Sequence, residues 1–75
     1  MIVRTSIELG HLVREHRLLA ALTQAQLAAH VGVSRQWIIA LERGKRTAEL
    51  ALVLRTLNVL GLDLDVHPRT GGRHR

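Results

Sequence analysis

The chain has 75 residues, a length that fits one small domain. Eleven Lys and Arg against six Asp and Glu give a net charge of +5, which predicts non-specific attraction to nucleic acid. Cysteine is absent, which excludes disulfide scaffolds, thiolate zinc sites and cysteine nucleophiles. Secreted domains of this size normally need disulfides for stability, so we expect the protein to reside in a reducing cytoplasm. No apolar run approaches the roughly 20 residues of a membrane span, so we expect neither a membrane partner nor a signal peptide.

The apolar residues predict a helical protein. They make up 47% of the chain and include fourteen Leu and eight Ala, whereas Phe and Tyr are absent and Trp occurs once. A sandwich or barrel would want aromatic and β-branched residues, so we expect an all-α fold. A core of this size is marginal by itself, which leads us to expect association with a second copy.

The first helix is predicted over residues 6–21, after a short lead over residues 1–5. Thr5 or Ser6 can cap it, and Glu8 lies in the first turn, where the helix dipole favours a carboxylate. Apolar residues repeat at spacings of three and four along this helix, which predicts one buried stripe.

Two short helices follow, separated by a tight turn. Thr23 caps the first of them, and Gln26 completes a capping box. Gly32 suits the left-handed conformation in which helices commonly end. Ser34 caps the next helix, which is predicted over residues 35–43.

A fourth helix is predicted over residues 48–60, capped by Thr47 and ended by Gly61. It is apolar on nearly every side, which indicates burial on more than one face. The four helices together are expected to form one domain over residues 6–61.

Residues 62–67 alternate between apolar and polar, which is typical of a half-buried strand, and residues 68–75 are predicted to be a flexible basic tail. A lone strand leaves its backbone groups unpaired. It can pair with the lead at residues 2–4 or with the same strand of a second subunit. The second option predicts a homodimer whose interface contains four apolar side chains, Leu57, Leu62, Leu64 and Val66.

Residues 23–43 combine a cap, a small residue, a turn glycine and core positions at fixed spacing. Ala28 is small enough for a close helix crossing, Gly32 permits the turn, and Ile38 locks the two helices at a fixed angle. This is the helix-turn-helix pattern, whose second helix enters the DNA major groove.

Base-reading side chains are expected near the start of the 35–43 helix, on its outer face. Arg35 suits the two acceptors of guanine, and Gln36 suits the paired donor and acceptor of adenine. Ile39 points the same way and can touch a thymine methyl group.

These features resemble the Cro/phage-repressor (XRE-type) helix-turn-helix family. Residues 22–34 (LTQAQLAAHVGVS), 37–38 (WI) and 41–45 (LERGK) are close to its consensus, and the resemblance covers about residues 7–61. Within the family the chain looks most like the HipB-type antitoxins of toxin–antitoxin pairs, through residues 37–38, 41–45 and 47–50 (TAEL) and through the Leu-Gly-Leu and alternating strand at residues 60–66. The resemblance implies a four-helix lambda-repressor-like domain with a short C-terminal β-strand that pairs across a homodimer.

The resemblance also implies how DNA is held. Phosphate contacts fall to the helix starts and to the basic segment after the third helix, at Thr23, Gln24, Ser34, Arg43, Lys45 and Arg46. Trp37 has two open placements: it wedges between the third helix and the loop at residues 45–47, or it lies over the phosphates with its indole N–H donating to one. Ala40 stands where the family often has a longer base reader.

Arg17 and Glu42 match positions that often form a buried ion pair in this family, so the resemblance implies that they tie the first helix to the end of the third. A Glu late in a helix is unfavourable for the helix dipole, and a buried Arg partner would explain it. The implied role is structural.

The resulting prediction is a transcriptional repressor that binds a two-fold symmetric operator, and more narrowly an antitoxin that represses its own operon and holds a kinase-fold toxin. The alternative is a protein-interaction module on the same fold that does not read DNA sequence. No enzyme is expected, because no acid/base constellation is visible. No cofactor or metal is expected either: His11 and Glu15 share a helix face near His16, and no third ligand stands at a fixed spacing.

Overall fold

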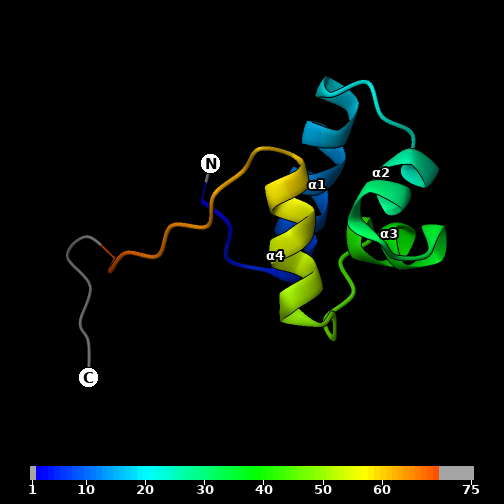
Figure 1. The fold of residues 1–75 in the computed structure, drawn as a ribbon. Coiled ribbons are helices and arrows are strands. Elements are labelled where there is room, and N and C mark those ends of the chain that lie inside the picture. Colours follow the sequence, from blue (N-terminus) through cyan, green and yellow to red (C-terminus); the bar gives the residue numbers. More distant parts are fainter. Residues whose placement is uncertain (1, 70–75) are drawn as a thin grey trace.

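The computed structural model describes residues 2–69, so residues 70–75 of the predicted tail lie outside the described part. The chain forms four helices: α1 (Ser6–Leu19), α2 (Gln24–Val31), α3 (Arg35–Glu42) and α4 (Leu50–Val59). α1 packs against α3, α3 against α2, and α2 against α4 (Figure 1). The predicted all-α fold of four helices is confirmed.

Three helices begin at side-chain caps that the sequence predicts. The hydroxyl of Thr5 accepts from the N–H of Glu8, whose carboxylate accepts in return from the N–H of Thr5. Thr23 and Gln26 form the same box at the start of α2. Ser34 Oγ accepts from a backbone N–H in the first turn of α3. Each cap satisfies N–H groups that have no partner inside the helix.

α1 ends at Leu19, before the predicted end at residue 21. Ala21 takes a left-handed conformation (φ 58°), and the N–H of Leu22 donates to the carbonyl of Arg17 at 3.1 Å. Glycine usually occupies such a position, because a Cβ crowds the backbone there. The sequence has Ala instead, so the usual mark of a helix end is missing.

The predicted start of α4, capped by Thr47, is wrong. Residues 47–49 are not helical, Glu49 has an extended backbone (φ −65°, ψ 125°), and α4 begins at Leu50 without a side-chain cap. Ala48 packs against the hydrophobic core, so a tertiary contact holds the segment before α4. This contact overrides the capping tendency of Thr47.

All four helices contribute to one core. Its buried apolar side chains are Val13, Leu27, Ala28, Val31, Ile38, Leu41, Val53 and Leu57. Leu57 therefore packs inside the subunit, and its predicted place in a dimer interface is wrong. Because α4 is apolar on nearly every side, the sequence pattern does not reveal which of its leucines faces the core.

A buried ion pair joins α1 to the end of α3. Arg17 Nε donates to Glu42 Oε2 at 2.7 Å, and Arg17 Nη2 donates to Glu42 Oε1 at 3.1 Å. Arg17 Nη1 also donates to the carbonyl of Leu22 at 2.9 Å, and Gln24 Nε2 donates to Glu42 Oε1 at 3.1 Å. The two charged side chains are 8% and 3% exposed, and no buried side-chain polar atom among residues 2–69 lacks a partner.

α1 crosses the last turn of α3 at Gly10. A Cβ atom on Gly10 would lie 2.6 Å from the carbonyl oxygens of both Leu41 and Glu42, closer than real Cβ atoms approach. Only a glycine permits this crossing, which brings the α1 face that carries Arg17 against the end of α3. A glycine inside a helix is a sequence sign of close packing, and Gly10 carries that sign here.

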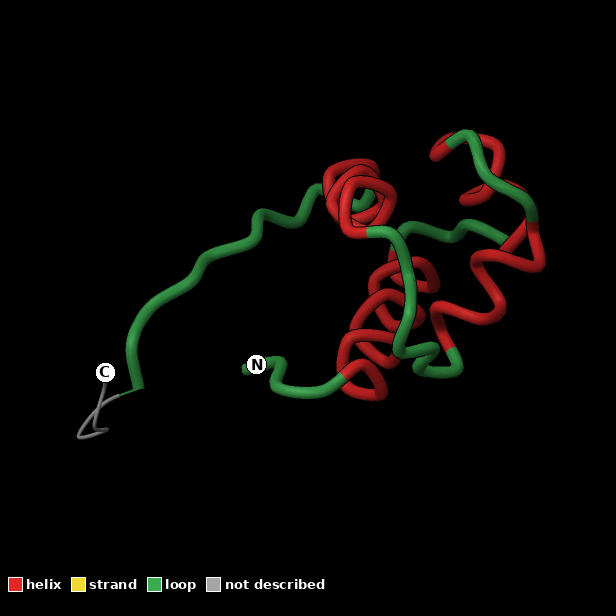
Figure 2. The backbone as a smooth tube through the Cα atoms, turned by 90° about the horizontal axis from the view of Figure 1, so that it is seen from below, coloured by secondary structure: helices red, strands yellow, loops and turns green. Residues whose placement is uncertain are grey.

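After a turn at Gly61 (φ 74°), residues 62–69 leave α4 as an extended segment (Figure 2). The described part of the chain contains no strand, so the pairing of residues 62–67 with the N-terminal lead is not formed. Leu62 is half-buried against the core, whereas Leu64 and Val66 are 61% and 84% exposed. The other option needs a second chain, and pairing between subunits stays a prediction.

Replacing Glu42 with Ala should destabilise the fold strongly. The change leaves the Arg17 guanidinium buried without its charged partner, which costs about 3–5 kcal/mol of unfolding free energy. Glu15→Ala is the matched control, because Glu15 is exposed on α1 and its loss should cost less than about 0.5 kcal/mol. Urea denaturation followed by circular dichroism measures both variants. A Glu42→Ala protein as stable as the wild type would contradict this role of the ion pair.

Candidate nucleic-acid interface

α2 and α3 form a helix-turn-helix unit. Gly32 ends α2 in a left-handed conformation (φ 87°), and the N–H groups of Gly32 and Val33 both donate to the carbonyl of Ala28. From α4, Arg55 Nη1 donates to the carbonyl of Val31 at 3.1 Å, where a cation also interacts favourably with the helix dipole. This contact is not predicted from the sequence, where a lone Arg inside the apolar α4 is its one sign.

α3 divides into a buried face and an outer face. Ile38 and Leu41 point into the core. Arg35 and Gln36 are exposed, and Ile39 is half-buried. The structure therefore brings the three predicted base readers to the outer side of α3, away from the helices that hold it.

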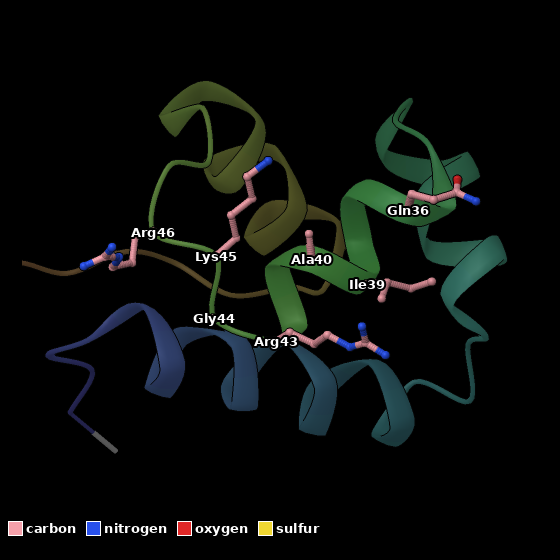
Figure 3. A pocket seen from close by; sticks show the side chains of 7 residues that line it. All are labelled: Gln36, Ile39, Ala40, Arg43, Gly44, Lys45 and Arg46. Carbon is pink, nitrogen blue, oxygen red and sulfur yellow. The ribbon is translucent and has the colours of Figure 1, made fainter.

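An open hollow of about 540 Å³ lies between the outer face of α3 and the segment that follows it (Figure 3). Seven residues line it: Gln36, Ile39, Ala40, Arg43, Gly44, Lys45 and Arg46. Three of them are Arg or Lys, and none is acidic. Figure 3 shows Gln36, Ile39 and Ala40 projecting from α3, while Lys45 stands beside Ala40 and Arg46 points away from the helix.

The acidic residue of α3 is turned away from this outer face. Glu42 is buried and paired with Arg17, so its carboxylate adds little negative charge at the surface. Arg35 and Arg43 are exposed, as are the two basic residues that follow Gly44. The charged side chains exposed on the outer side of α3 and on residues 43–46 are therefore all positive.

The predicted phosphate-binding residues at the helix starts already make bonds within the chain. The hydroxyls of Thr23 and Ser34 accept from helix N–H groups, and each keeps its own proton to donate. Gln24 donates one amide N–H to Glu42, a contact that the sequence analysis did not foresee. Its second amide N–H is left for another acceptor.

Trp37 is half-buried and packs against the hydrophobic core. The sequence leaves two placements for this side chain, packing within the domain or contact with phosphates, and the observed burial matches the first. The side chain thereby holds the first turn of α3 on the body of the protein, next to Ile38. A contact of its indole with a phosphate stays a prediction.

Two further observations concern membrane-spanning helices and metal sites. No helix in the described part of the chain is long and apolar enough to cross a membrane. Among residues 2–69, no three His, Asp or Glu side chains are grouped so that they could hold a metal ion.

Comparison with known proteins matches this architecture. Residues 8–69 match the helix-turn-helix domain family. Over 50 residues the chain is 52% identical to an uncharacterized HTH-type transcriptional regulator of Methanothermobacter thermautotrophicus, covering 67% of this chain and 72% of that protein. Over 64 residues it is 39% identical to the uncharacterized HTH-type transcriptional regulator y4mF of Sinorhizobium fredii, covering 85% of this chain and 84% of that protein.

A solved structure shares the fold. The restriction-modification controller protein C.AhdI from Aeromonas hydrophila superposes with a TM-score of 0.71 at 29% sequence identity, over 77% of this chain and 84% of that chain. With a family match over most of its length and relatives named as regulators, this chain belongs to the helix-turn-helix family of transcriptional regulators.

Proposed function

We propose that the protein is a sequence-specific transcriptional repressor that binds a two-fold symmetric DNA operator as a homodimer. The observation that carries this proposal is the outer side of α3. There, exposed Arg35 and Gln36 adjoin a hollow with three basic lining residues and no acidic one. Membership of a family of regulators supports the same function.

Base reading falls to the first turn of α3. The guanidinium of Arg35 offers two parallel N–H groups to N7 and O6 of guanine, and the amide of Gln36 matches N7 and N6 of adenine. The opposite face of α3 is fixed in the core through Ile38 and Leu41. The reading residues therefore stand on a rigid support, which limits the entropy lost on binding.

Phosphates are held from two sides of α3. On one side lie the first turns of α2 and α3, whose N–H groups favour an anion. On the other side lie Arg43, Lys45 and Arg46. Such contacts fix the orientation of the protein but carry no sequence information, and they make binding depend on salt.

A homodimer would place two α3 helices in successive major grooves, roughly 34 Å apart. The exposure of Leu64 and Val66 and the unpaired backbone of residues 63–67 support pairing between two copies. Leu50 and Leu54 of α4 are also exposed and add apolar surface. A dimer bound in this way excludes other proteins from the operator, which is the simplest route to repression.

A narrower form of the proposal is an antitoxin that represses its own operon and holds a kinase-fold toxin. It rests on the resemblance of residues 37–38, 41–45 and 47–50 to HipB-type antitoxins. The alternative, a protein-interaction module that does not read DNA sequence, is separated from both by the selection experiment that follows.

Site selection from a random pool of duplexes tests sequence reading. The wild type is expected to enrich an inverted repeat. Arg35→Ala should lose about 1–3 kcal/mol of affinity for that duplex and relax the preference at one base pair of each half-site. Lys45→Ala is the contrast, because it should weaken binding to every duplex and keep the preference. An unchanged preference in Arg35→Ala would contradict the role of this residue, and a wild type that enriches nothing favours the protein-interaction module.

The salt dependence of affinity tests the phosphate contacts. Lys45→Ala and Arg46→Ala should each lower the slope of log K against log salt by about 0.9, because one fewer counterion is released. Arg69→Ala removes the same charge from the extended segment, away from α3, and should leave the slope unchanged (Figure 1). Equal slopes for all three variants would show that the charge acts through the whole molecule and not through contacts beside α3.

Sedimentation equilibrium tests the proposed dimer. Leu64→Lys should yield a monomer with weaker operator binding, because the two-fold pairing would bury two unpaired ammonium groups. His67→Lys introduces the same side chain on the polar side of the segment and should leave the dimer intact. A dimer that survives Leu64→Lys would show that helices, and not the extended segments, hold the two copies together.

A further inference from the structure

The hollow beside α3 has an apolar centre within a polar rim. Ala40 ends at its Cβ, Ile39 flanks it, and both are half-buried (Figure 3). Gln36 and Arg43 line the hollow from the same face of α3, because the four residues are spaced at i, i+3, i+4 and i+7. Lys45 closes one side. A longer side chain at Ala40 would fill this space.

The chemistry of the apolar centre restricts what can fill it. Hydrogen-bond donors and acceptors cover the major-groove edges of the base pairs, and the apolar exception is the C5 methyl group of thymine. 5-Methylcytosine carries the same methyl on the same ring carbon. A methyl seated on Ile39 and Ala40 leaves water, which is favourable, while the flanking phosphates meet the basic side chains of the rim. Uracil or unmethylated cytosine at the same place leaves the apolar centre uncovered.

We propose that the hollow over Ala40 is a subsite for the C5 methyl group of a pyrimidine, supplied by thymine or by 5-methylcytosine. The inference rests on the proposed function, since it requires α3 to lie in the major groove. It adds a base preference that the hydrogen bonds of Arg35 and Gln36 do not provide. It also makes operator affinity sensitive to cytosine methylation at one position of each half-site.

The expected effect follows from the burial of one methyl group. Its loss from one half-site should lower affinity about four-fold, and its loss from both half-sites of a symmetric duplex about fifteen-fold. Effects of this size are within the range of an equilibrium titration at fixed salt.

The test uses the full chain and the duplex enriched from the random pool. In one arm, each thymine and its symmetry mate are replaced by deoxyuridine, which removes only the methyl group. One symmetric pair should show the full loss. In the other arm, each cytosine pair is replaced by 5-methylcytosine. A gain of the same size at one symmetric pair, with thymine exchanges silent, assigns the subsite to methylated cytosine.

A protein variant links the methyl effect to the hollow. Ala40→Gln fills the apolar centre, so it should bind the thymine and uracil duplexes equally at the sensitive position. Ala29→Gln is the matched control on the exposed side of α2 and should keep the difference. Thermal melting of both variants checks that they fold, and the base exchanges on the wild type need no variant at all.

The outcomes separate this inference from the proposed function. An enriched duplex whose affinity is unchanged by every exchange would overturn the methyl subsite and leave the sequence-reading repressor intact. A methyl effect that persists in Ala40→Gln would place the contact elsewhere and overturn the subsite as well. A wild type that enriches no duplex would overturn the proposed function and the subsite with it.

Discussion

The bonds around one buried carboxylate, that of Glu42, fix the geometry on which the rest of this molecule depends. Burying the Arg17–Glu42 pair costs several kcal/mol of desolvation per ion, so apolar residues of similar volume would stabilise the fold at least as well. The charged groups instead fix the relative orientation of the segments that they join, because their hydrogen bonds are directional. Arg17 binds both oxygens of Glu42 and the carbonyl of Leu22, and Gln24 donates to the same carboxylate. α1, the turn before α2, the first residue of α2 and the last residue of α3 are thus held in one arrangement.

This arrangement decides the charge of the surface beside α3. An exposed carboxylate at Glu42 would repel DNA phosphates, whereas the buried pair removes that charge from the outer face. The crossing at Gly10 makes the pair possible, because a Cβ atom there would push α1 away from the end of α3. A wider crossing would separate Arg17 from Glu42 and leave both charges partly hydrated. The lack of a side chain at Gly10 on α1 therefore contributes to the positive charge of the surface beside α3.

The features of the fold that can be predicted from the sequence are those determined by residues close together in the chain. The cap Thr23 and the turn glycine Gly32 act on backbone atoms within one helical turn, and helical periodicity alone indicates the outer side of α3. The start of α4 depends on Ala48 packing against the core, and no local pattern shows that contact. The sequence pattern places Leu57 on the wrong surface because α4 is apolar on nearly every side. The bond from Gln24 to Glu42 and the hollow after α3 both depend on the path of segments distant in sequence.

The proposed surface for base reading and the proposed surface for association lie on different parts of the molecule. α3 lies on one side of the helical body, and the extended segment leaves on the other side (Figures 1 and 2). In the proposed dimer, association through that segment would leave both copies of α3 exposed, so that two half-sites could be read together and the second contact would form at high effective concentration. In such a symmetric complex every base contact is made twice, and its free energy counts twice. The proposed contact of one methyl group on Ala40 would then change the affinity for an operator about fifteen-fold, compared with about four-fold for the same contact made once by a monomer.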